Sequence, residues 1–153
     1  MGLFSSMQWS GPSGYGASTT AEQVTADLNL SEKTYLVTGC NAGLGMETVR
    51  VLALRGARVL ALARTLEKAE EVSARMPGNV VPMCCELSEP FSIRAAVQEV
   101  KVLNIELDAV IANAGIMALP KTARKNGYEL QFFTNHVGHF LLVTGLLEQL
   151  EAN

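Results

Sequence analysis

Three closely spaced glycines, Gly39, Gly43 and Gly45, suggest a site for a phosphate group. They lie between a short apolar run at residues 35–37 and a segment at 46–54 whose apolar residues have helical spacing. The first turn of a helix offers unpaired N–H groups and the positive end of the helix dipole to an anion. A glycine-rich turn between a strand and a helix therefore predicts a site for the pyrophosphate of a dinucleotide.

Each of these glycines is expected to serve the site in a different way. Gly39 can adopt a backbone conformation that a side chain would disfavour where the strand turns. Gly43 leaves room for a phosphate to approach the main chain, and Gly45 lets the helix pack closely on the strands.

The residue that follows the second predicted strand, at 58–63, indicates which dinucleotide the site would prefer. An Asp or Glu at this place would hydrogen-bond to the ribose 2′-hydroxyl of NAD. This chain has Arg64 instead. An acid would repel a 2′-phosphate, whereas arginine pairs with one through forked hydrogen bonds. The sequence therefore predicts NADP rather than NAD, the alternative being a solvated arginine at a strand end.

Strands and helices alternate along the chain and must position these residues. The predicted strands cover residues 35–37, 58–63, 80–84 and 107–112. The predicted helices cover residues 21–28, 46–54, 66–75, 88–103 and 127–150, with a loop at 117–126. This alternation predicts an α/β fold, a Rossmann-type doubly wound parallel sheet of about four strands in the order 3-2-1-4 with right-handed crossovers and flanking helices.

Local signals predict where several helices begin and end. Gly56 stands where a glycine commonly follows a helix, and Thr65 is placed to cap the helix after it. Ser88, with Pro90 just inside, is expected to begin the helix at 88–103.

The N-terminal residues 1–18 are rich in Gly and Ser and predict a flexible leader before a domain at 19–153. Their first six residues, MGLFSS, fit the N-myristoylation pattern, although that pattern is short and permissive. Residues 19–22 have the form of a capping box, and Val24 and Leu28 could form a small apolar stripe on the helix that follows.

Composition excludes several classes of protein. The 153 residues are 48% apolar and 18% charged, as in a globular domain rather than a disordered segment. The net charge is −3 and no basic tract is longer than the pair Arg124 and Lys125, so nothing indicates a nucleic-acid partner. The longest mostly apolar run, 137–147, is too short to span a membrane.

Three cysteines, Cys40, Cys84 and Cys85, have no metal-ligand spacing such as CxxC. An odd number of cysteines without a signal peptide predicts reduced thiols and a cytoplasmic location. The adjacent pair at 84–85 is expected to belong to the core rather than to a redox centre.

Two further groups of residues allow both a structural and a functional interpretation. His136 and His139 are spaced to share one face of a helix and could form a metal pair, but no third ligand is evident, so no metal site is expected. Lys121, Arg124 and Lys125 could contact a substrate or phosphate, or could simply be a solvated loop.

The motifs resemble those of a known family. Residues 38–45, TGCNAGLG, match the TGxxxGxG signature of the short-chain dehydrogenase/reductases, and 113–115 match the NAG of their fourth strand. Residues 135–140, NHVGHF, are similar to the NHxGHF segment of the retinol-dehydrogenase-like branch, and Arg64 stands where NADP-preferring members carry arginine. The resemblance covers roughly residues 19–150.

The resemblance implies a role for each matching residue. The pyrophosphate and ribose would be lined by Gly39, Asn41, Gly43, Leu44 and Gly45. The adenine would lie beside Glu86 and Leu87, and the central part of the cofactor would lie against Asn113, Ala114 and Gly115. Asn135 would be the active-site asparagine that holds a proton-relay water near the catalytic lysine.

The chain departs from the family pattern in two respects. Glu86 stands where members usually have Asp, which could weaken a contact with the adenine. The family's catalytic Ser and Tyr-x-x-x-Lys find no match, because Thr19, Gly39 and Phe132 stand four positions after the three tyrosines. Carbonyl reduction by hydride needs a proton donor. We therefore expect a truncated, cofactor-binding N-terminal part, inactive alone.

Three functions remain open from the sequence. The first is an NADP-dependent oxidoreductase acting on a small alcohol or carbonyl substrate, present as a fragment. The second is a non-catalytic dinucleotide-binding or regulatory module. The third is another Rossmann-like protein such as a methyltransferase, which Arg64 disfavours because those sites usually carry an acid for the ribose. Self-association is expected through the last helix or through the strand at 107–112, whose apolar residues would form an open edge.

Overall fold

The two central strands of the sheet are apolar because helices cover both of their faces. In the computed structural model, which describes residues 12–151, these strands are β1 (Thr34–Thr38) and β2 (Arg58–Ala63). Successive side chains point to opposite faces, so that Leu36 belongs to one core cluster and Val37 to the other. Strands buried on both faces require continuous apolar sequence, which is the pattern that identified them.

Among the described residues the sheet has four parallel strands in the order β3-β2-β1-β4, which confirms the predicted 3-2-1-4 topology. The outer strands are β3 (Asn79–Cys84) and β4 (Ala109–Ile111). Leu36 of β1 is paired with Leu60 of β2 on one side and with Val110 of β4 on the other.

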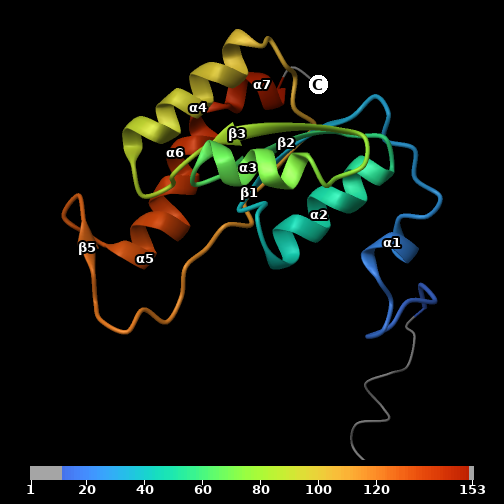
Figure 1. Cartoon of the computed structure of the whole chain (residues 1–153), viewed down its shortest axis with the longest axis horizontal. Helices are drawn as coiled ribbons and strands as arrows, with labels where there is room; N and C mark the ends of the chain where they lie inside the picture. Colours follow the sequence, from blue (N-terminus) through green and yellow to red (C-terminus); the bar gives the residue numbers. More distant parts are fainter. Residues whose placement is uncertain (1–11, 152–153) are drawn as a thin grey trace, which may run out of the picture.

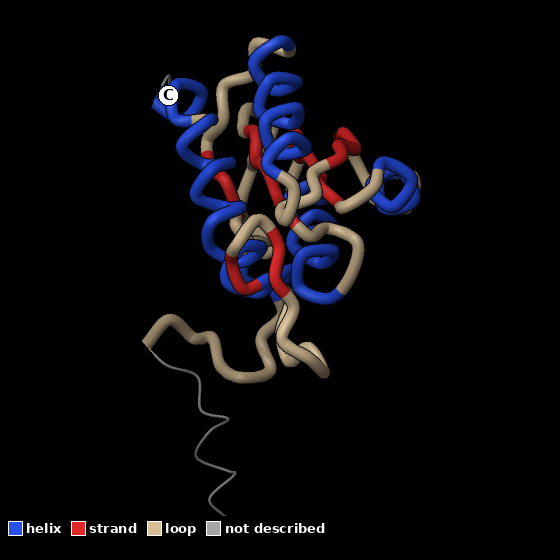
Figure 2. Tube along the Cα trace, turned by 90° about the vertical axis from the view of Figure 1, so that its left-hand side faces the viewer, coloured by secondary structure: helices blue, strands red, loops and turns tan. Residues whose placement is uncertain are grey.

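Two helical layers enclose the sheet (Figures 1 and 2). One layer contains α2 (Gly43–Leu54) and α3 (Leu66–Ser73), which contribute Val49, Ala53, Ala69 and Val72 to one core cluster. The other layer contains α4 (Pro90–Val102) and α6 (Gly138–Gly145), which contribute Ile93, Ala96, Val100 and Leu142 to the second cluster.

The predicted helix ends are confirmed at two places and wrong at a third. The Thr65 hydroxyl accepts from Lys68 N and caps α3, and Gly56 follows α2 with φ +93°. Helix α4 begins at Pro90 and its N-cap is Glu89, not Ser88. Ser88 is engaged elsewhere, because its backbone N–H and its hydroxyl both donate to one carboxylate oxygen of Glu86.

The N-terminal helix α1 (Ala21–Val24) is shorter than the predicted helix at 21–28. Its capping box is formed by Thr20 and Gln23, one residue later than the pattern predicted. The expected apolar stripe is wrong, because Val24 and Leu28 are 47% and 51% exposed. The helix is held to α2 by polar contacts, among them the ion pair between Glu22 and Arg50. The myristoylation pattern and most of the predicted leader lie outside the described residues.

The predicted continuous helix at 127–150 is wrong. A hairpin of β5 (Arg124–Lys125) and β6 (Tyr128–Glu129) comes first, and its turn residues Asn126 and Gly127 both have positive φ. The Asn-Gly pair is a hairpin signal inside what was predicted to be a loop followed by a helix. Glu129 ends the hairpin and caps the next helix, because its carboxylate accepts from two backbone N–H groups.

Up to Glu151, the last residue that the structure describes, the helical region beyond the hairpin is divided into four pieces. They are α5 (Leu130–Phe132), the π-helical turn η2 (Phe133–Val137), α6 and α7 (Leu147–Glu151). In the π-turn a backbone hydrogen bond spans five residues instead of the four of an α-helix: Gly138 N–H donates to Phe133 O.

The fourth strand is shorter than predicted, and Leu107 is not part of an open edge. Its side chain is fully buried, and its N–H donates to the carbonyl of Gln149 in α7. The last helix therefore covers the start of the segment that the sequence placed in the strand.

An ion pair at the amino end of the sheet predicts a pH-dependent contribution to stability. Lys33 Nζ donates to Asp108 Oδ1 at 2.6 Å, and Thr34 N donates to Oδ2 at 2.7 Å. The hydrogen bond from Lys33 is the main cause that lowers the pKa of Asp108. A carboxylate with a lowered folded-state pKa stabilises the protein above its unfolded pKa, about 3.9, and loses this effect as pH falls through the folded-state pKa.

We therefore expect Asp108→Asn to lower the free energy of unfolding by roughly 1 kcal/mol at pH 7. The difference from the wild type should shrink below about pH 4. Urea denaturation at a series of pH values measures it. Glu148→Gln is the control, because the Glu148 side chain paired with Lys101 is 79% exposed and water screens that pair. A pH-independent difference for Asp108→Asn would contradict the assignment.

Candidate functional site

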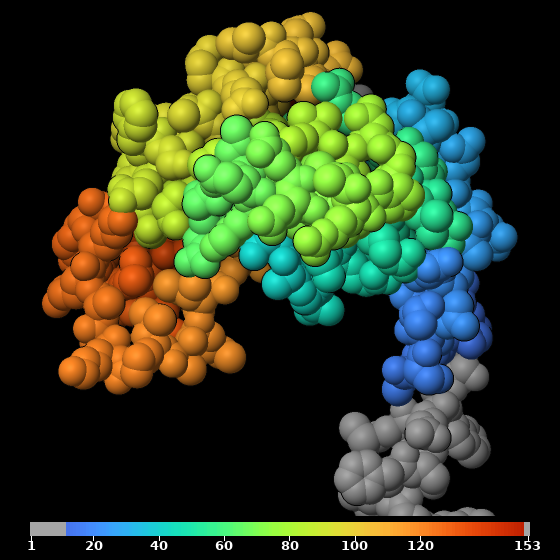
Figure 3. Space-filling view, viewed as in Figure 1, coloured from blue at the N-terminus to red at the C-terminus, as the bar shows by residue number. Residues whose placement is uncertain are grey.

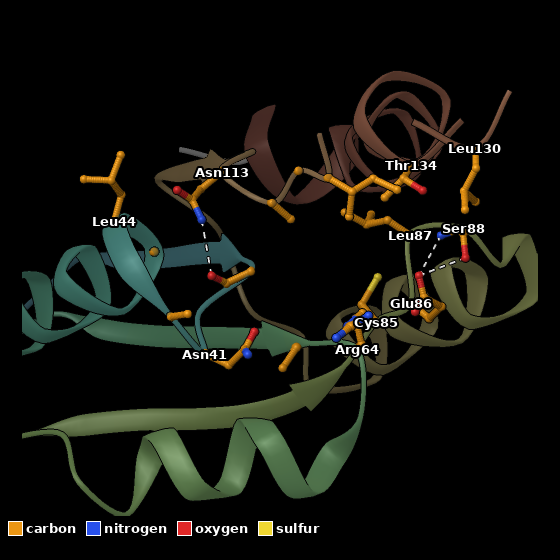
Figure 4. A pocket seen from close by; sticks show the side chains of 17 residues that line it. Asn41, Leu44, Arg64, Cys85, Glu86, Leu87, Ser88, Asn113, Leu130 and Thr134 are labelled. Carbon is orange, nitrogen blue, oxygen red and sulfur yellow. Dashed lines mark hydrogen bonds between the residues drawn. The ribbon is translucent and has the colours of Figure 1, made fainter. Parts of the chain in front are cut away.

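A cleft of about 530 Å³ lies at the carboxyl ends of the strands, where the chain passes from β1 into α2 and from β4 into the next loop. Ligands of doubly wound sheets bind at this edge, beside the strands where the order reverses. Ten predicted site residues line the cleft: Gly39, Asn41, Leu44, Gly45, Arg64, Glu86, Leu87, Asn113, Ala114 and Gly115. Figure 4 labels Asn41, Arg64, Glu86, Leu87 and Asn113 around the cleft, and Figure 3 shows the hollow beside the segment around the hairpin.

The glycine turn at the start of the cleft needs its glycines for two physical reasons, a positive φ and close packing. Gly39 has φ +68°, and a Cβ there would lie 2.8 Å from the Cα of Ala114. A Cβ at Gly45 would overlap the carbonyl oxygen of Gly39 and the side-chain nitrogen of Asn113. Gly43 has φ +54° with open space around it, and it does not itself line the cleft. Its glycine is required by the backbone conformation.

The N-terminus of α2 faces the cleft with its first N–H groups uncapped by a side chain. Its N-cap is Ala42, which makes no side-chain hydrogen bond, and its first turn contains no acidic residue. A twelve-residue helix with such an end presents unpaired donors and a positive dipole end to the cleft. This end is chemically suited to a phosphate oxygen.

Arg64 follows β2 directly and its side chain is exposed at the cleft. Among residues 12–151 its guanidinium forms no ion pair and no side-chain hydrogen bond. It is therefore free to pair with an anionic ligand.

Glu86 lines the cleft, but its carboxylate is committed to the local turn. One oxygen accepts from the backbone N–H and the hydroxyl of Ser88, both at 3.0 Å, and Glu86 N donates to Ser92 Oγ at 2.9 Å. Through these contacts Glu86 shapes the loop between β3 and α4.

Asn113 ties the end of β4 to the glycine turn. Its side-chain N–H₂ donates to Thr38 O at 2.9 Å and to Gly39 O at 3.3 Å. The backbone N–H of Ala114 donates to Thr38 Oγ1 at 3.0 Å. These contacts hold the two walls of the cleft together at the switch point.

Asn135, the predicted active-site asparagine, does not line the cleft. It lies in η2, and its side chain makes a pair of hydrogen bonds with the backbone of Ile116: Oδ1 accepts from N at 2.9 Å, and Nδ2 donates to O at 2.8 Å. Asn135 therefore fixes the chain segment that follows the Asn113–Gly115 turn.

The cleft also contains residues that the motifs did not single out: Ala42, Ala63, Cys85, Ser88, Ile116, Leu130 and Thr134. Thr134 is 7% exposed, and its buried hydroxyl has no hydrogen-bond partner among the described residues. The sequence signal that could have identified Thr134 as a site residue is its position directly before Asn135. Burial raises the pKa of the Cys85 thiol to about 12, which keeps it protonated and agrees with a core role.

Several of the remaining candidates are engaged in structural contacts. His139 is buried with both ring nitrogens hydrogen-bonded, whereas His136 is exposed and lies 5.3 Å from the Phe132 ring. Lys125 pairs with Glu89, outside the cleft lining. Within residues 12–151 no cluster of three or more metal-ligating side chains occurs. In the same part of the chain, no helix has the length and apolar character needed to cross a membrane.

Comparison with known proteins agrees with this geometry. The family model described as short chain dehydrogenase matches residues 33–153. Short-chain dehydrogenase TIC 32 B of Brassica napus is 38% identical over 94% of this chain and 46% of its own length, and human retinol dehydrogenase 11 is 39% identical over 84% and 42%. A metagenomic short-chain oxidoreductase solved in complex with NADP matches with a TM-score of 0.68 and 26% identity, over 80% of this chain and 58% of its own. The chain spans less than half the length of these two curated relatives.

Proposed function

This chain belongs to the short-chain dehydrogenase family, and on that basis we propose that its cleft binds NADP(H). We further propose that it is the cofactor-binding part of an oxidoreductase that acts on an alcohol or carbonyl compound. The main support is the cleft itself, where an uncapped helix N-terminus, a glycine turn and the unpaired Arg64 meet at the carboxyl ends of the strands. A related structure holds NADP, and a relative is a retinol dehydrogenase.

The residues of this chain would hold the two ends of the cofactor differently. The backbone N–H groups at the start of α2 would bind the pyrophosphate, and Arg64 would bind the 2′-phosphate. Leu87 and the turn shaped by Glu86 would lie beside the adenine. The buried hydroxyl of Thr134, which has no hydrogen-bond partner among the described residues, would form a hydrogen bond with the bound cofactor.

Bound NADP(H) would supply or accept the hydride at the other end, beside Asn113–Gly115. A proton donor must act on the substrate oxygen at the same time. The 153 residues contain no Tyr-x-x-x-Lys sequence. We therefore propose that this chain, taken alone, binds the cofactor without turning over substrate.

Cofactor titration tests the first part of this proposal. Isothermal titration calorimetry of the 153-residue chain with NADPH and with NADH should show saturable binding of both near one site per chain, with NADPH tighter. Absence of binding by either dinucleotide would contradict the function.

In the presence of saturating NADPH, retinoid, steroid or simple carbonyl compounds should cause no oxidation of the cofactor. Substrate-dependent oxidation would instead show that another residue supplies the proton.

We also propose that the chain self-associates at micromolar concentration. Helices α5, α6 and α7 leave Phe132, Phe140 and Leu147 respectively 50%, 60% and 44% exposed, while within residues 12–151 strand β4 pairs only with β1. Exposed apolar side chains and an unpaired strand edge each favour association. Static light scattering should show a mass that rises with concentration, and Phe140→Ser should reduce the rise. A stable monomer over this range would contradict the proposal.

A further inference from the structure

His139 is a buried histidine that links two elements remote from each other in the sequence. It is 7% exposed, belongs to α6, and does not line the cleft. Its Nε2 lies 2.8 Å from Thr38 Oγ1, the last residue of β1, and its Nδ1 lies 2.9 Å from the carbonyl oxygen of Asn135 in η2.

The partners of His139 determine where its ring proton lies. The Asn135 carbonyl can only accept, so Nδ1 must carry the proton that it donates. Thr38 Oγ1 accepts from Ala114 N–H and has one hydrogen of its own to donate. The nearer of its two acceptors is His139 Nε2 at 2.8 Å, the other being Ile111 O at 3.5 Å. The imidazole is therefore the Nδ1–H tautomer with an accepting Nε2.

Both hydrogen bonds of His139 lead to the same wall of the cleft. Through Thr38 Oγ1, the histidine orients the acceptor of the Ala114 N–H. Through the Asn135 carbonyl, it steadies the residue whose side chain holds both backbone groups of Ile116. Residues 114–116 line the cleft, so the histidine acts on this wall from behind, at both of its ends.

The packing around α6 is compatible with these contacts of His139. Gly138 lies so close to the β3–α4 connection that a Cβ there would overlap the carbonyl oxygen of Leu87. The neighbouring buried residue of the same helix, Leu142, is apolar and belongs to the core cluster. A histidine at a buried helix position costs desolvation unless both nitrogens are satisfied, and here both are.

We propose that His139 is a positioning residue for the dinucleotide site. It fixes the Thr38 hydroxyl and the Asn135 backbone, so that residues 114–116 are already positioned to contact the central part of the cofactor when it binds. This role rests on the proposed function, because it concerns the same cleft, but the hydrogen bonds on which it depends exist without ligand.

The first test compares NADPH affinity among variants of the 153-residue chain. His139→Leu removes both hydrogen bonds and should weaken binding roughly tenfold, a typical result of leaving a buried partner unsatisfied. His139→Gln can still accept from Thr38 and should restore most of the affinity. His136→Gln, the same replacement on the adjoining π-turn at an exposed position, should have no effect. Wild-type affinity in His139→Leu would overturn the proposal.

A double-mutant cycle distinguishes positioning from general loss of stability. Thr38→Val removes the same link from its other end, so the losses in NADPH affinity caused by Thr38→Val and His139→Leu should be less than additive in the double variant. Additive losses would show that the two residues act independently and would overturn the proposal.

Amide hydrogen exchange separates this proposal from the proposed function. In the ligand-free chain, the Ala114 N–H should exchange roughly tenfold faster in His139→Leu than in the wild type, because its acceptor loses its orientation. The reference amide is Arg58 N–H, which donates to Lys33 O at the other end of the sheet. If the wild type bound no dinucleotide, the function would fail, while this exchange ratio would still decide the role of His139. Unchanged Ala114 exchange would overturn it.

Discussion

Replacing Arg64 by alanine is expected to weaken the binding of NADPH by about 1.5–3 kcal/mol, or ~10- to ~150-fold in Kd. The reason is the unpaired guanidinium at the end of β2, which is exposed at the cleft and has no ion-pair partner among the described residues. Charged hydrogen bonds to a 2′-phosphate would be lost, and NADH, which lacks that phosphate, should bind with nearly unchanged affinity. Calorimetric titration with both dinucleotides measures the difference.

Two further variants sharpen this test. Arg75→Ala removes the same charge from an exposed position outside the cleft lining, and it should leave both affinities unchanged. Arg64→Asp places an acid where it can accept from a ribose 2′-hydroxyl, so it should favour NADH over NADPH. Equal losses of affinity for NADPH and NADH in Arg64→Ala would show that the side chain supports the cleft without contacting the 2′-phosphate.

Replacing Gly45 by alanine is expected to lower the free energy of unfolding by about 3 kcal/mol and to abolish detectable dinucleotide binding. The added methyl would overlap the Gly39 carbonyl and the Asn113 side chain, and it would lie 3.0 Å from the Gly39 carbonyl carbon. The backbone atoms cannot move away independently, so α2 must shift from β1. That shift would displace the helix N–H groups from the cleft. Urea denaturation followed by circular dichroism and calorimetric titration measure the two effects.

Gly43→Ala is the matched control, since it makes the same change two residues earlier. Its methyl would meet open space, and only the positive φ of +54° disfavours it, at a cost of roughly 1 kcal/mol. We therefore expect a much smaller loss of stability in this variant. Equal losses of stability in Gly43→Ala and Gly45→Ala would mean that backbone conformation, rather than close packing, explains the requirement for glycine at both positions.

Local sequence was sufficient wherever one short segment contained the whole signal. The apolar runs of β1 and β2 identified strands buried on both faces, and Thr65 identified a helix cap, because both depend on residues within a few positions of each other. The alternation of strands and helices then restricted the topology to the observed parallel order. The place of Arg64 at the cleft followed from the same topology.

Prediction failed where a local signal competed with another signal of similar strength. Ser88 is a good helix cap, but its N–H and its hydroxyl donate to the Glu86 carboxylate, and the N-cap is Glu89, one residue later. The apolar residues at 127–150 fit a helix throughout, yet Asn126 and Gly127 turn the chain into a hairpin first. The apolar pattern could not reveal the π-turn either, because the change in backbone hydrogen bonding within one helical turn produces no recognisable period in the sequence.

The sequence alone determined the fold class, the strand order, the glycine turn and ten of the residues that line the cleft. Tertiary structure alone decided what the polar side chains do there: Asn135 holds the backbone of Ile116, Thr134 presents a buried hydroxyl, and His139 reaches Thr38 across 101 positions of the chain. The physical reason is that backbone geometry and burial are governed by neighbouring residues. A hydrogen bond between distant residues depends instead on strand register and helix packing to within a few tenths of an ångström, which no local spacing specifies.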